Sequence, residues 1–221
     1  MTNEPYIVKP CTDEVETLYT DEDLLLVNKP SGLLSVPGKH PANKDCLATR
    51  VQQQYPSARI VHRLDMDTSG IMVLALNTDS HRALSRLFAE RKVTKEYEAN
   101  VFGIVSDSRR LIDLPLICDW PNRPRQKVDF QHGKSAQTWV QKIFQHADGW
   151  TRLLLTPVTG RSHQLRVHLA DIGHPILGCE FYAHQQAADM ANRLQLHATK
   201  LEFPHPNSGE TILGISTCPF Q

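Results

Sequence analysis

A polar loop that runs directly into an apolar segment places the strongest constraint on how this chain can fold. The loop is the decapeptide Val61–Gly70, which holds a cation, an imidazole, two carboxylates and two hydroxyls. The segment Ile71–Leu76 that follows is wholly apolar and predicts a buried strand. A polar loop anchored to a core strand can hold a reactive group rigidly. A single loop Asp is more often a turn residue that satisfies its own backbone, but here the whole decapeptide has to be explained.

Length and composition indicate an ordinary globular protein. The 221 residues suffice for one large domain or two small ones, and 40% of them are hydrophobic. No stretch resembles a membrane span, and the N-terminus lacks the pattern of a secretion signal. The cysteines are odd in number and form no C-x-x-C pair, which favours reduced thiols in the cytoplasm over a disulfide framework or a structural zinc site. They are Cys11, Cys46, Cys118, Cys179 and Cys218.

The formal net charge of zero conceals an uneven distribution. Residues 1–23 hold seven acidic side chains and one basic one, Lys9. The remainder of the chain therefore carries 23 basic and 17 acidic side chains, an excess of +6. That excess is compatible with a polyanionic partner but does not require one.

Hydrophobic spacing predicts more strands than helices. Neighbouring strands have short connections, and the βαβ rhythm of a doubly wound sheet is absent. We therefore expect an α+β protein with a mixed, largely antiparallel sheet and flanking helices, in one domain over residues 21–221 after an acidic lead-in at 1–20. The predicted strands are 24–27, 71–76, 95–101, 136–144, 150–157, 195–203 and 210–216, and the predicted helices are 46–55, 78–91, 162–172 and 184–193.

Capping residues define the ends of the predicted helices. Asp45, Thr78 and Ser162 are each placed to cap a helix N-terminus, while Pro56 stops the first helix and Gly173 ends the third. The faces predicted to meet the core are Ala83, Leu84, Leu87 and Phe88 in the second helix, Leu165, Leu169 and Ile172 in the third, and Tyr97, Ala99 and Val101 in a strand, where Tyr97 faces either the core or a cleft.

The segment from Asp113 to Lys127 is proline-rich, and we expect it to be irregular. It contains Trp120, Arg123 and Arg125 as well as Lys127. A solvated surface loop would explain it. A basic loop with one aromatic residue is also a common way to contact RNA phosphates and stack a base, and the two interpretations are about equally supported.

Several familiar kinds of site are absent from the sequence. There is no glycine-rich phosphate loop, and His62-Arg63-Leu64-Asp65 lacks the Asn that follows in a kinase catalytic loop. No H-E-x-x-H occurs, and His163 and His168 lie roughly 140° apart around a helix, which makes them poor metal co-ligands. We therefore expect no metal and no cofactor. A carboxylate acting alone as nucleophile or general base remains, and Arg166 is a candidate to keep it ionised.

The motifs as a set resemble the RluA family of pseudouridine synthases. His62-Arg63-Leu64-Asp65, followed by Thr68-Ser69-Gly70, closely resembles the family's catalytic motif. Three further matches occur in the expected order: Asn28-Lys29-Pro30-Ser31-Gly32, Lys95-Glu96-Tyr97, and Gly160-Arg161-Ser162-His163-Gln164-Leu165-Arg166-Val167-His168 with Gly173-His174-Pro175-Ile176-Leu177-Gly178 after it. The similarity extends from about residue 20 to the C-terminus. Four ordered motifs are far more specific than any one of them.

The resemblance implies a fold and a substrate. It implies the pseudouridine synthase fold with a central RNA-binding cleft, and we expect no additional N-terminal S4-type RNA-binding domain of the kind that many relatives have. The segment Leu114–Pro124 resembles the short family members with dual specificity. Those enzymes modify a uridine in a hairpin of 23S rRNA and one in tRNA anticodon stem-loops. The expected partner is therefore RNA, with no membrane and no stable protein partner, and the expected state is a monomer.

The resemblance also assigns roles to residues. It implies that Asp65 is the catalytic carboxylate, that Tyr97 stacks on the target base, and that Arg166 forms an ion pair with Asp65. Arg63 would fill the space that the flipped base leaves. Whether the carboxylate attacks C1′, attacks C6 or removes the C2′ proton stays open. The remaining candidates for RNA contacts are His62, Arg161, Trp120, Arg123, Arg125 and Lys127.

Each assignment has an ordinary alternative. Asp67 could be the reactive carboxylate, Tyr97 could be part of the core, and Arg166 could be a surface charge. Arg63 could simply bind phosphate. The histidines His62, His163, His168 and His197 are expected to make structural hydrogen bonds rather than to transfer protons. Two other functions remain: a catalytically silent RNA-binding module, and a carboxylate-dependent nucleoside or glycoside hydrolase with Asp67 as its second acid.

Overall fold

The computed structural model describes residues 7–220, which divide into two compact units. Unit 1 comprises Met1–Thr94 and Ala198–Thr217, and unit 2 comprises Lys95–His197 and Cys218–Gln221. Of the acidic N-terminal side chains, Glu4 lies outside the described residues. That residues 21–221 act as one catalytic domain stays a prediction.

The sheet of unit 1 is built on the apolar segment that follows the polar loop. Strand β4 (Ser69–Ala75) is buried along its whole length, and antiparallel β2 (Leu24–Lys29) lies beside it. The short strand β3 (Arg59–Ile60) also pairs with β4. Strand β1 (Glu16–Thr20) pairs with β2, so regular structure begins inside the range predicted as a lead-in. Its side chains are mostly exposed, which explains why β1 has no apolar alternation.

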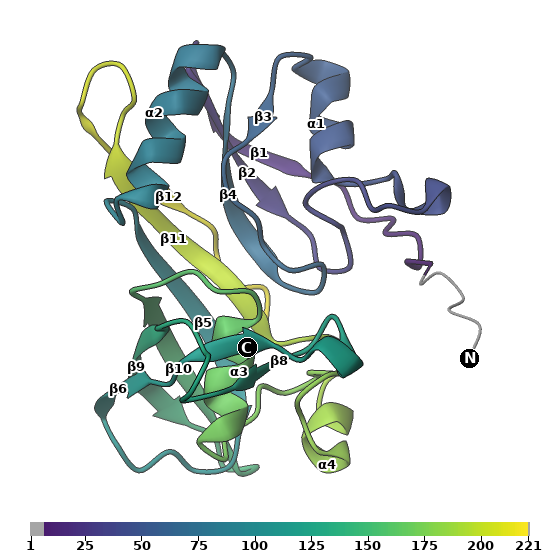
Figure 1. The fold of residues 1–221 in the computed structure, drawn as a ribbon, viewed down its shortest axis with the longest axis vertical. Coiled ribbons are helices and arrows are strands. Elements are labelled where there is room, and N and C mark those ends of the chain that lie inside the picture. The colour runs from purple at the N-terminus through teal and green to yellow at the C-terminus, as the bar shows by residue number, and fades with distance from the viewer. Residues whose placement is uncertain (1–6, 221) are drawn as a thin grey trace. The chain divides into compact units, whose positions relative to one another are not determined.

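The C-terminal hairpin contributes to the same unit. Strand β11 (Leu196–Pro204) passes from unit 2 into unit 1 and pairs antiparallel with β12 (Thr211–Ile215), as the sequence predicted. The turn between them connects Pro204 to Thr211, the two residues that face each other at the end of the ladder. Figure 1 shows this hairpin in yellow at the edge of unit 1.

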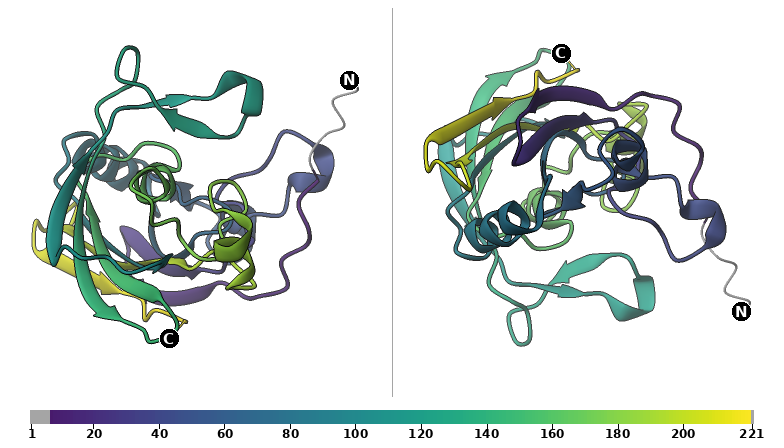
Figure 2. Two further views of the ribbon diagram at one scale, coloured as in Figure 1. Left: turned by 90° about the horizontal axis from the view of Figure 1, so that it is seen from below. Right: turned by 90° about the horizontal axis from the view of Figure 1, so that it is seen from above.

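Two helices cover one side of the unit 1 strands (Figure 2). Helix α1 (Leu47–Gln54) is capped by Cys46 and Thr49 rather than by Asp45. The Asp45 carboxylate instead accepts two hydrogen bonds from Arg50, at 2.7 and 2.6 Å. Helix α2 (Thr78–Ala89) is capped by the side chain of Asn77, not by Thr78. Both predicted caps were therefore wrong by one residue, because the neighbouring side chain reaches the free amide of the first turn. A 3-10 turn, η1 (Pro41–Asn43), precedes α1.

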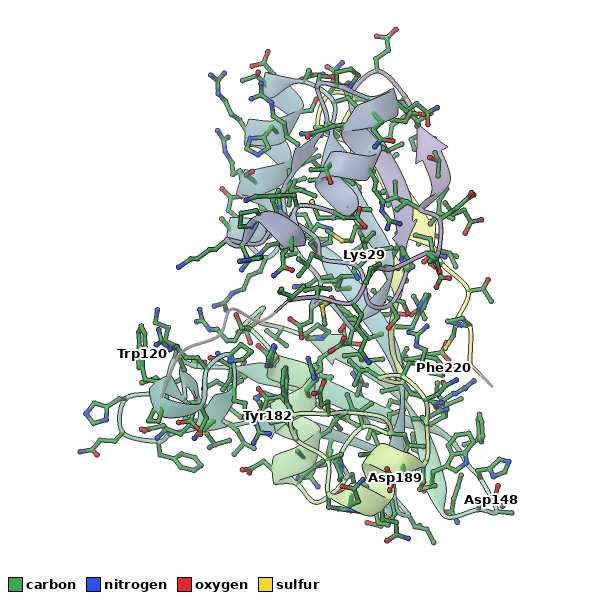
Figure 3. All side chains as sticks on the ribbon, turned by 90° about the vertical axis from the view of Figure 1, so that its right-hand side faces the viewer. Lys29, Trp120, Asp148, Tyr182, Asp189 and Phe220 are labelled. Carbon is green, nitrogen blue, oxygen red and sulfur yellow. The ribbon has the colours of Figure 1, made fainter. Side chains whose placement is uncertain are left out.

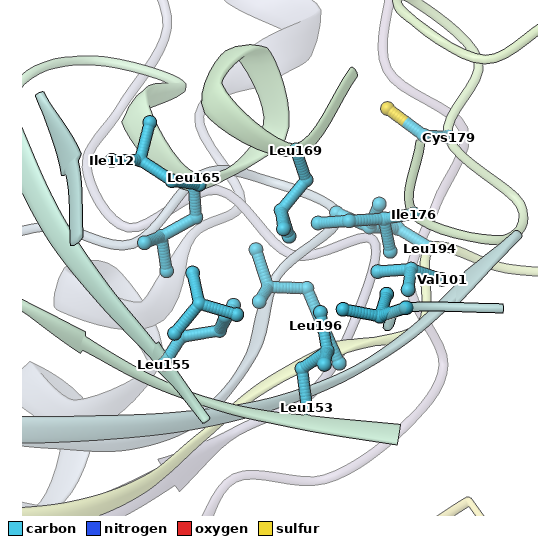
Figure 4. Close-up of a cluster of buried hydrophobic side chains, with 13 residues drawn as sticks. Val101, Ile112, Leu153, Leu155, Leu165, Leu169, Ile176, Cys179, Leu194 and Leu196 are labelled. Atoms are coloured by element: carbon cyan, nitrogen blue, oxygen red, sulfur yellow. The ribbon is translucent and has the colours of Figure 1, made fainter. Parts of the chain in front are cut away.

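Four antiparallel strands form the sheet of unit 2, in the order β5, β10, β9, β6. Their inward faces pack on the apolar stripe of helix α3 (Gln164–Asp171), and Figure 4 shows Leu165 and Leu169 of α3 against Leu153 and Leu155 of β10. This confirms the predicted stripe and the predicted class, an α+β protein with a largely antiparallel sheet. The bounds are β5 Thr94–Phe102, β10 Trp150–Pro157, β9 Gln137–Gln145 and β6 Arg109–Asp113.

The proline-rich segment is more regular than its sequence predicted. Strands β7 (Leu116–Cys118) and β8 (Gln126–Val128) form an antiparallel hairpin with a 3-10 turn, η2 (Trp120–Asn122), between them. The prediction of an irregular loop was wrong because the prolines lie outside the ladder, where they cost no strand hydrogen bond. Figure 2 shows the β7–β8 hairpin standing apart from the four-stranded sheet.

The ends of the unit 2 helices depart from two predictions. Ser162 does not cap α3: the N-cap position is His163, whose backbone is left-handed at φ 54° and whose side chain makes no capping bond. Gly173 ends the helix as predicted, at φ +86°, and its amide donates to the Ala170 carbonyl at 3.0 Å. Helix α4 (Gln185–Asp189) is shorter than the predicted 184–193.

A buried polar chain joins α3 to strand β9. The Gln164 side-chain amide donates to the Thr138 hydroxyl at 3.0 Å, and that hydroxyl lies 3.0 Å from His168 Nδ1. His168 Nε2 lies 3.0 Å from the Leu114 carbonyl oxygen, just before the hairpin. Since a carbonyl only accepts, Nε2 carries the proton and Nδ1 accepts from Thr138. His168 is therefore a structural hydrogen-bonding residue, as predicted.

Burial lowers the pKa of His168, opposed by its hydrogen bond to the Leu114 carbonyl and by the charges of Asp171 and Asp113. The unfolded chain takes up a proton at the ordinary histidine pKa, about 6.5, before the folded protein does. Stability contributed by neutral His168 is thus full above this value and is lost as the pH falls below it toward the lower folded pKa.

His168→Gln should remove part of this pH dependence. We expect the free energy of unfolding, measured in urea at about pH 7.5 and about pH 5.5, to fall less in the variant than in the wild type, because glutamine does not titrate. His132→Gln is the matched control, since it makes the same replacement at an exposed histidine outside the buried polar chain. An equal fall in His168→Gln and the wild type would contradict the assignment.

Candidate active site

In unit 1, Asp65 lies in the polar loop between β3 and β4. The loop turns tightly after it, because the Thr68 amide donates to the Asp65 carbonyl at 3.2 Å. Asp65 is partly buried, whereas Arg63 is exposed. Gly70 ends the loop at φ +120°, and a Cβ there would lie 2.2 Å from the Ala198 carbonyl oxygen. Only glycine fits this position at the start of β4.

The fully buried side chain of Lys29 holds the loop in place. Its ammonium group donates to the carbonyls of Pro30 at 2.8 Å, Leu33 at 2.7 Å and Met66 at 3.0 Å. Three donors thus meet three acceptors, which offsets much of the cost of burying a cation. Because Met66 directly follows Asp65, Lys29 fixes the backbone beside the candidate carboxylate.

Two serines and a glycine extend this support to both sides of Asp65. The Ser35 hydroxyl donates to the Leu64 carbonyl at 2.7 Å and accepts from the Leu64 amide at 3.2 Å. The Ser31 hydroxyl donates to the Asp67 carbonyl at 2.6 Å, and the Gly32 amide donates to the Met66 carbonyl at 2.9 Å. We call Lys29, Ser31, Gly32 and Ser35 the loop clamp. Sequence reasoning identified Asn28–Gly32 as a motif and a turn but did not predict that it holds the Asp65 loop.

His62 has a structural contact of its own. Its Nε2 accepts from the Val73 amide at 3.1 Å, and its ring stacks on Phe88 with centroids 4.5 Å apart. These contacts join the start of the loop to strand β4 and to helix α2. They confirm the expected structural hydrogen bond of His62, and its contact with RNA stays a prediction.

In unit 2, Tyr97 lies on β5 and packs against the main apolar cluster. Its neighbours on the same face, Ala99 and Val101, are fully buried, whereas Tyr97 is only partly buried. The strand period is therefore as predicted. A partly buried aromatic ring can present its accessible surface to a ligand while the sheet fixes its orientation.

Arg166 is one of the largest fully buried side chains of the chain, with 2% exposure. Its Nε donates to the Cys179 sulfur at 3.4 Å, and its guanidinium lies 5.2 Å from the Phe181 ring and 5.5 Å from the Tyr182 ring. The alternative that Arg166 is a surface helix charge is therefore wrong. A guanidinium at this depth needs a compensating anion or hydrogen-bond acceptors, which makes it a strong binding site for a carboxylate.

Arg161 lies in the turn that leads into α3. Its amide donates to the Gln164 side-chain oxygen at 3.0 Å, and its Nε donates to the Ser135 carbonyl at 3.1 Å. The side chain is exposed, so it remains accessible to a phosphate. Arg161 lies beside the start of α3 because only a short turn separates that helix from β10.

The remaining predicted RNA contacts gather on the β7–β8 hairpin. Trp120 is 65% exposed and lies at the far end of the hairpin (Figure 3), with the Arg123 guanidinium 4.5 Å from its ring. Arg125 lies 5.8 Å from the Phe181 ring, and Lys127 is exposed on β8. Phe130, which sequence reasoning missed, is 78% exposed just after β8. Exposed aromatic rings beside cations suit base stacking and phosphate contacts.

Residues 7–220 hold neither a cluster of metal ligands nor a membrane-spanning helix. No group of three or more His, Cys, Asp or Glu residues in this range could hold a metal ion. Among the described helices, none is both long and apolar enough to cross a bilayer. All five cysteines are free.

Comparison with known proteins identifies the family of this chain. Residues 23–171 match the family described as RNA pseudouridylate synthase. The Dual-specificity RNA pseudouridine synthase RluA of Yersinia pestis is 58% identical over 192 residues, which cover 87% of this chain and 93% of that protein. The enzyme of the same name from Escherichia coli K12 is 53% identical over 195 residues, covering 88% and 89% of the two chains.

A solved structure agrees with the sequence comparisons. Human RNA Pseudouridylate Synthase Domain Containing 1 superimposes with a TM-score of 0.80 and 30% sequence identity, covering 99% of this chain and 87% of the human chain. This confirms the pseudouridine synthase fold that the motifs implied. The chain therefore belongs to the RNA pseudouridylate synthase family.

Proposed function

We propose that this RNA pseudouridine synthase uses Asp65 as its catalytic carboxylate and acts on loop uridines of both 23S rRNA and tRNA anticodon stem-loops. The clamped loop is the observation that supports Asp65 most directly, since backbone contacts fix the residues on both sides of it. The dual substrate is supported by the relatives from Yersinia pestis and Escherichia coli, both described as dual-specificity enzymes.

The isomerisation exchanges one glycosidic bond for another. The C1′–N1 bond of uridine breaks, the uracil rotates in place, and a C1′–C5 bond forms, while C5 loses a proton to the solvent and N1 gains one. No atoms are gained, so the reaction itself requires no cofactor. The freed uracil must stay bound and shielded from water between the two steps, which places the demand on rigid side chains.

In this proposal Tyr97 stacks on the uracil and Arg166 forms an ion pair with the Asp65 carboxylate. The half-buried ring of Tyr97 on a core strand supports the first role, and the buried guanidinium of Arg166 supports the second. Exposed Arg63 occupies the space left by the flipped uridine. Flipping costs a few kcal/mol in a duplex and less in a loop, which favours loop uridines as substrates.

RNA is held in this proposal through the β7–β8 hairpin, Arg161 and His62. Trp120 and Phe130 offer stacking surfaces, and Arg123, Arg125 and Lys127 offer phosphate contacts. The enzyme acts as a cytoplasmic monomer, and its five free cysteines support a reducing compartment.

Asp65→Asn should abolish turnover while RNA binding survives. We expect tritium release from RNA labelled at uridine C5 to fall more than about 10³-fold, because an amide is neither nucleophile nor base. The dissociation constant should change less than about threefold, because phosphate contacts dominate affinity. Asp67→Asn is the matched control and should keep near-wild-type turnover. The reverse pattern would make Asp67 the catalytic carboxylate.

The same assay separates the proposal from its alternatives. It uses tRNA and 23S rRNA transcripts with no added metal or nucleotide. Release of tritium without free uracil supports a synthase, free uracil indicates a hydrolase, and binding without either indicates a silent module. Failure of the wild type to release tritium from either RNA would refute the proposed activity.

Lys29→Met should loosen the Asp65 loop. Removing the ammonium leaves three carbonyls without this donor, so we expect the free energy of unfolding to fall by about 3 kcal/mol. Lys44→Met is the control, because the exposed Lys44 ammonium donates to the single carbonyl of Gly38. Urea unfolding measures both. A loss in Lys29→Met no larger than in Lys44→Met would show that the loop clamp does not depend on Lys29.

Arg125→Ala combined with Lys127→Ala should weaken the salt dependence of RNA binding. Each phosphate contact contributes about −0.7 to −0.9 to the slope of log K against log salt concentration, so the slope should lose about 1.5. The control combines Arg82→Ala with Lys92→Ala, whose charges are already paired with Asp79 and Glu90. An unchanged slope in the hairpin variant would make this hairpin an ordinary solvated surface.

A further inference from the structure

Tyr182 makes two hydrogen bonds through one hydroxyl group. The Gln126 amide, on strand β8 of the hairpin, donates to the Tyr182 oxygen at 2.9 Å. The same oxygen lies 2.5 Å from His163 Nδ1. Since the oxygen accepts from Gln126, its single hydrogen is available for His163, so the hydroxyl links the hairpin to the first residue before α3.

The ring of Tyr182 contacts the candidate catalytic arginine. It belongs to a short segment, Cys179–Tyr182, that contacts Arg166 at three points: the Cys179 sulfur at 3.4 Å, the Phe181 ring at 5.2 Å and the Tyr182 ring at 5.5 Å. Cations over aromatic rings are attracted to the negative ring face, so these rings restrict where the guanidinium lies. Tyr182 therefore contacts Arg166 with its ring and the hairpin with its hydroxyl.

Apolar packing joins the same two parts of unit 2. Leu116 of β7, Ala136 and Val167 form a small buried cluster, and Val128 of β8 and Tyr182 pack against it. Val167 is the residue next to Arg166 in α3. A shift of the hairpin base therefore changes the packing of the helical turn that carries Arg166.

The backbone at His163 depends on this arrangement. It is left-handed at φ 54°, which is unfavourable for a residue with a side chain, and it lacks a side-chain cap. The His163 ring stacks on Phe181 with centroids 5.8 Å apart and bonds Tyr182, so the Phe181–Tyr182 pair holds the conformation that starts α3.

We propose that Tyr182 is a positioning residue that couples the seating of the β7–β8 hairpin to the orientation of Arg166. RNA bound on the hairpin then favours the arrangement of Arg166 that catalysis needs, as any ligand favours the state it binds more tightly. The inference rests on the proposed roles of the hairpin and of Arg166. Tyr182 itself touches neither the substrate nor the reacting atoms in this account.

Tyr182→Phe tests the hydroxyl while keeping the ring over Arg166. We expect the single-turnover rate of tritium release at saturating RNA to fall about tenfold, because the variant loses both hydrogen bonds of the hydroxyl, with RNA affinity within about threefold of wild type. Tyr19→Phe is the control, because the Tyr19 hydroxyl also makes a side-chain hydrogen bond, to Asp21, but lies in unit 1. A wild-type rate in Tyr182→Phe would overturn the proposal.

A double-mutant cycle with Trp120→Ala separates coupling from a purely structural role. Trp120 lies at the far end of the hairpin (Figure 3). In the wild type we expect Trp120→Ala to slow the saturated rate about fivefold, and in the Tyr182→Phe background to slow it by less than about twofold. Independent effects that multiply in the double variant would overturn the coupling, since a residue that only stabilises the fold predicts that result.

Amide hydrogen exchange tests the linkage without RNA or turnover. In Tyr182→Phe the Gln126 amide and the first turn of α3 should exchange faster, while the strands β9 and β10 keep wild-type protection. Unchanged exchange at Gln126 would overturn the linkage. If the proposed function were wrong, the wild type would release no tritium while the exchange pattern would still hold, so the two failures are distinguishable.

Discussion

The ammonium group of Lys29 is the interaction on which the candidate carboxylate of unit 1 depends. Burying a lysine completely is costly, and here the cost is offset because each of its three donors meets a backbone carbonyl. Two of those carbonyls, of Pro30 and Leu33, lie in its own turn, and the third, of Met66, lies in the Asp65 loop. Two segments separated by more than thirty residues thereby become one rigid piece. A guanidinium could not replace the ammonium, because its donors lie in a plane.

Unit 2 also holds a buried cation, Arg166, but it does so with a different set of contacts. Arg166 is buried on a helix whose polar neighbours, Gln164 and His168, are bonded to Thr138 and to the Leu114 carbonyl. These hydrogen bonds hold α3 against β9. The helix therefore cannot rotate about its axis and change the direction of the Arg166 side chain. Aromatic rings of Phe181 and Tyr182 then limit the guanidinium itself. The Phe181–Tyr182 pair therefore contacts both the guanidinium and His163 at the start of the helix.

Period and composition were enough to predict seven of the strands and the apolar face of each long helix, but not the short strands β1, β3, β6, β7 and β8. Ala99 and Val101 are buried as the alternation required, and Leu165 and Leu169 pack on β10 as the helical spacing required. Helix starts were less predictable. At Ser162, a suitable capping side chain is present, but the left-handed backbone of His163 starts the helix one residue later, and that conformation depends on contacts with Tyr182 and Phe181.

The site, too, has features that the sequence could predict and features that it could not. Asp65, Tyr97 and Arg166 could be nominated from the motifs, because motifs record residue identity and order. The contacts of the loop clamp could not be predicted from the motifs. Ser35 lies outside every motif, and its hydroxyl reaches Leu64 only in the folded chain. The burial of Arg166 was equally hidden, because a lone Arg on a helix is usually exposed. Tertiary contacts, rather than local sequence, determine both the loop clamp and the burial of Arg166.

If the β7–β8 hairpin binds RNA as proposed, its chemistry gives a reason why one enzyme would act on two RNAs. Trp120 and Phe130 expose large ring surfaces, and stacking tolerates any base because every base has a flat face. In the proposed complex, Arg123 and Lys127 contact phosphates, which all RNAs share. A hairpin built in this way selects for loop shape and for bases that can be unstacked, rather than for a long sequence. Two loops of different RNAs would then meet the same requirement, and in the proposed site the fit of the flipped uridine beside Asp65 would discriminate between uridines.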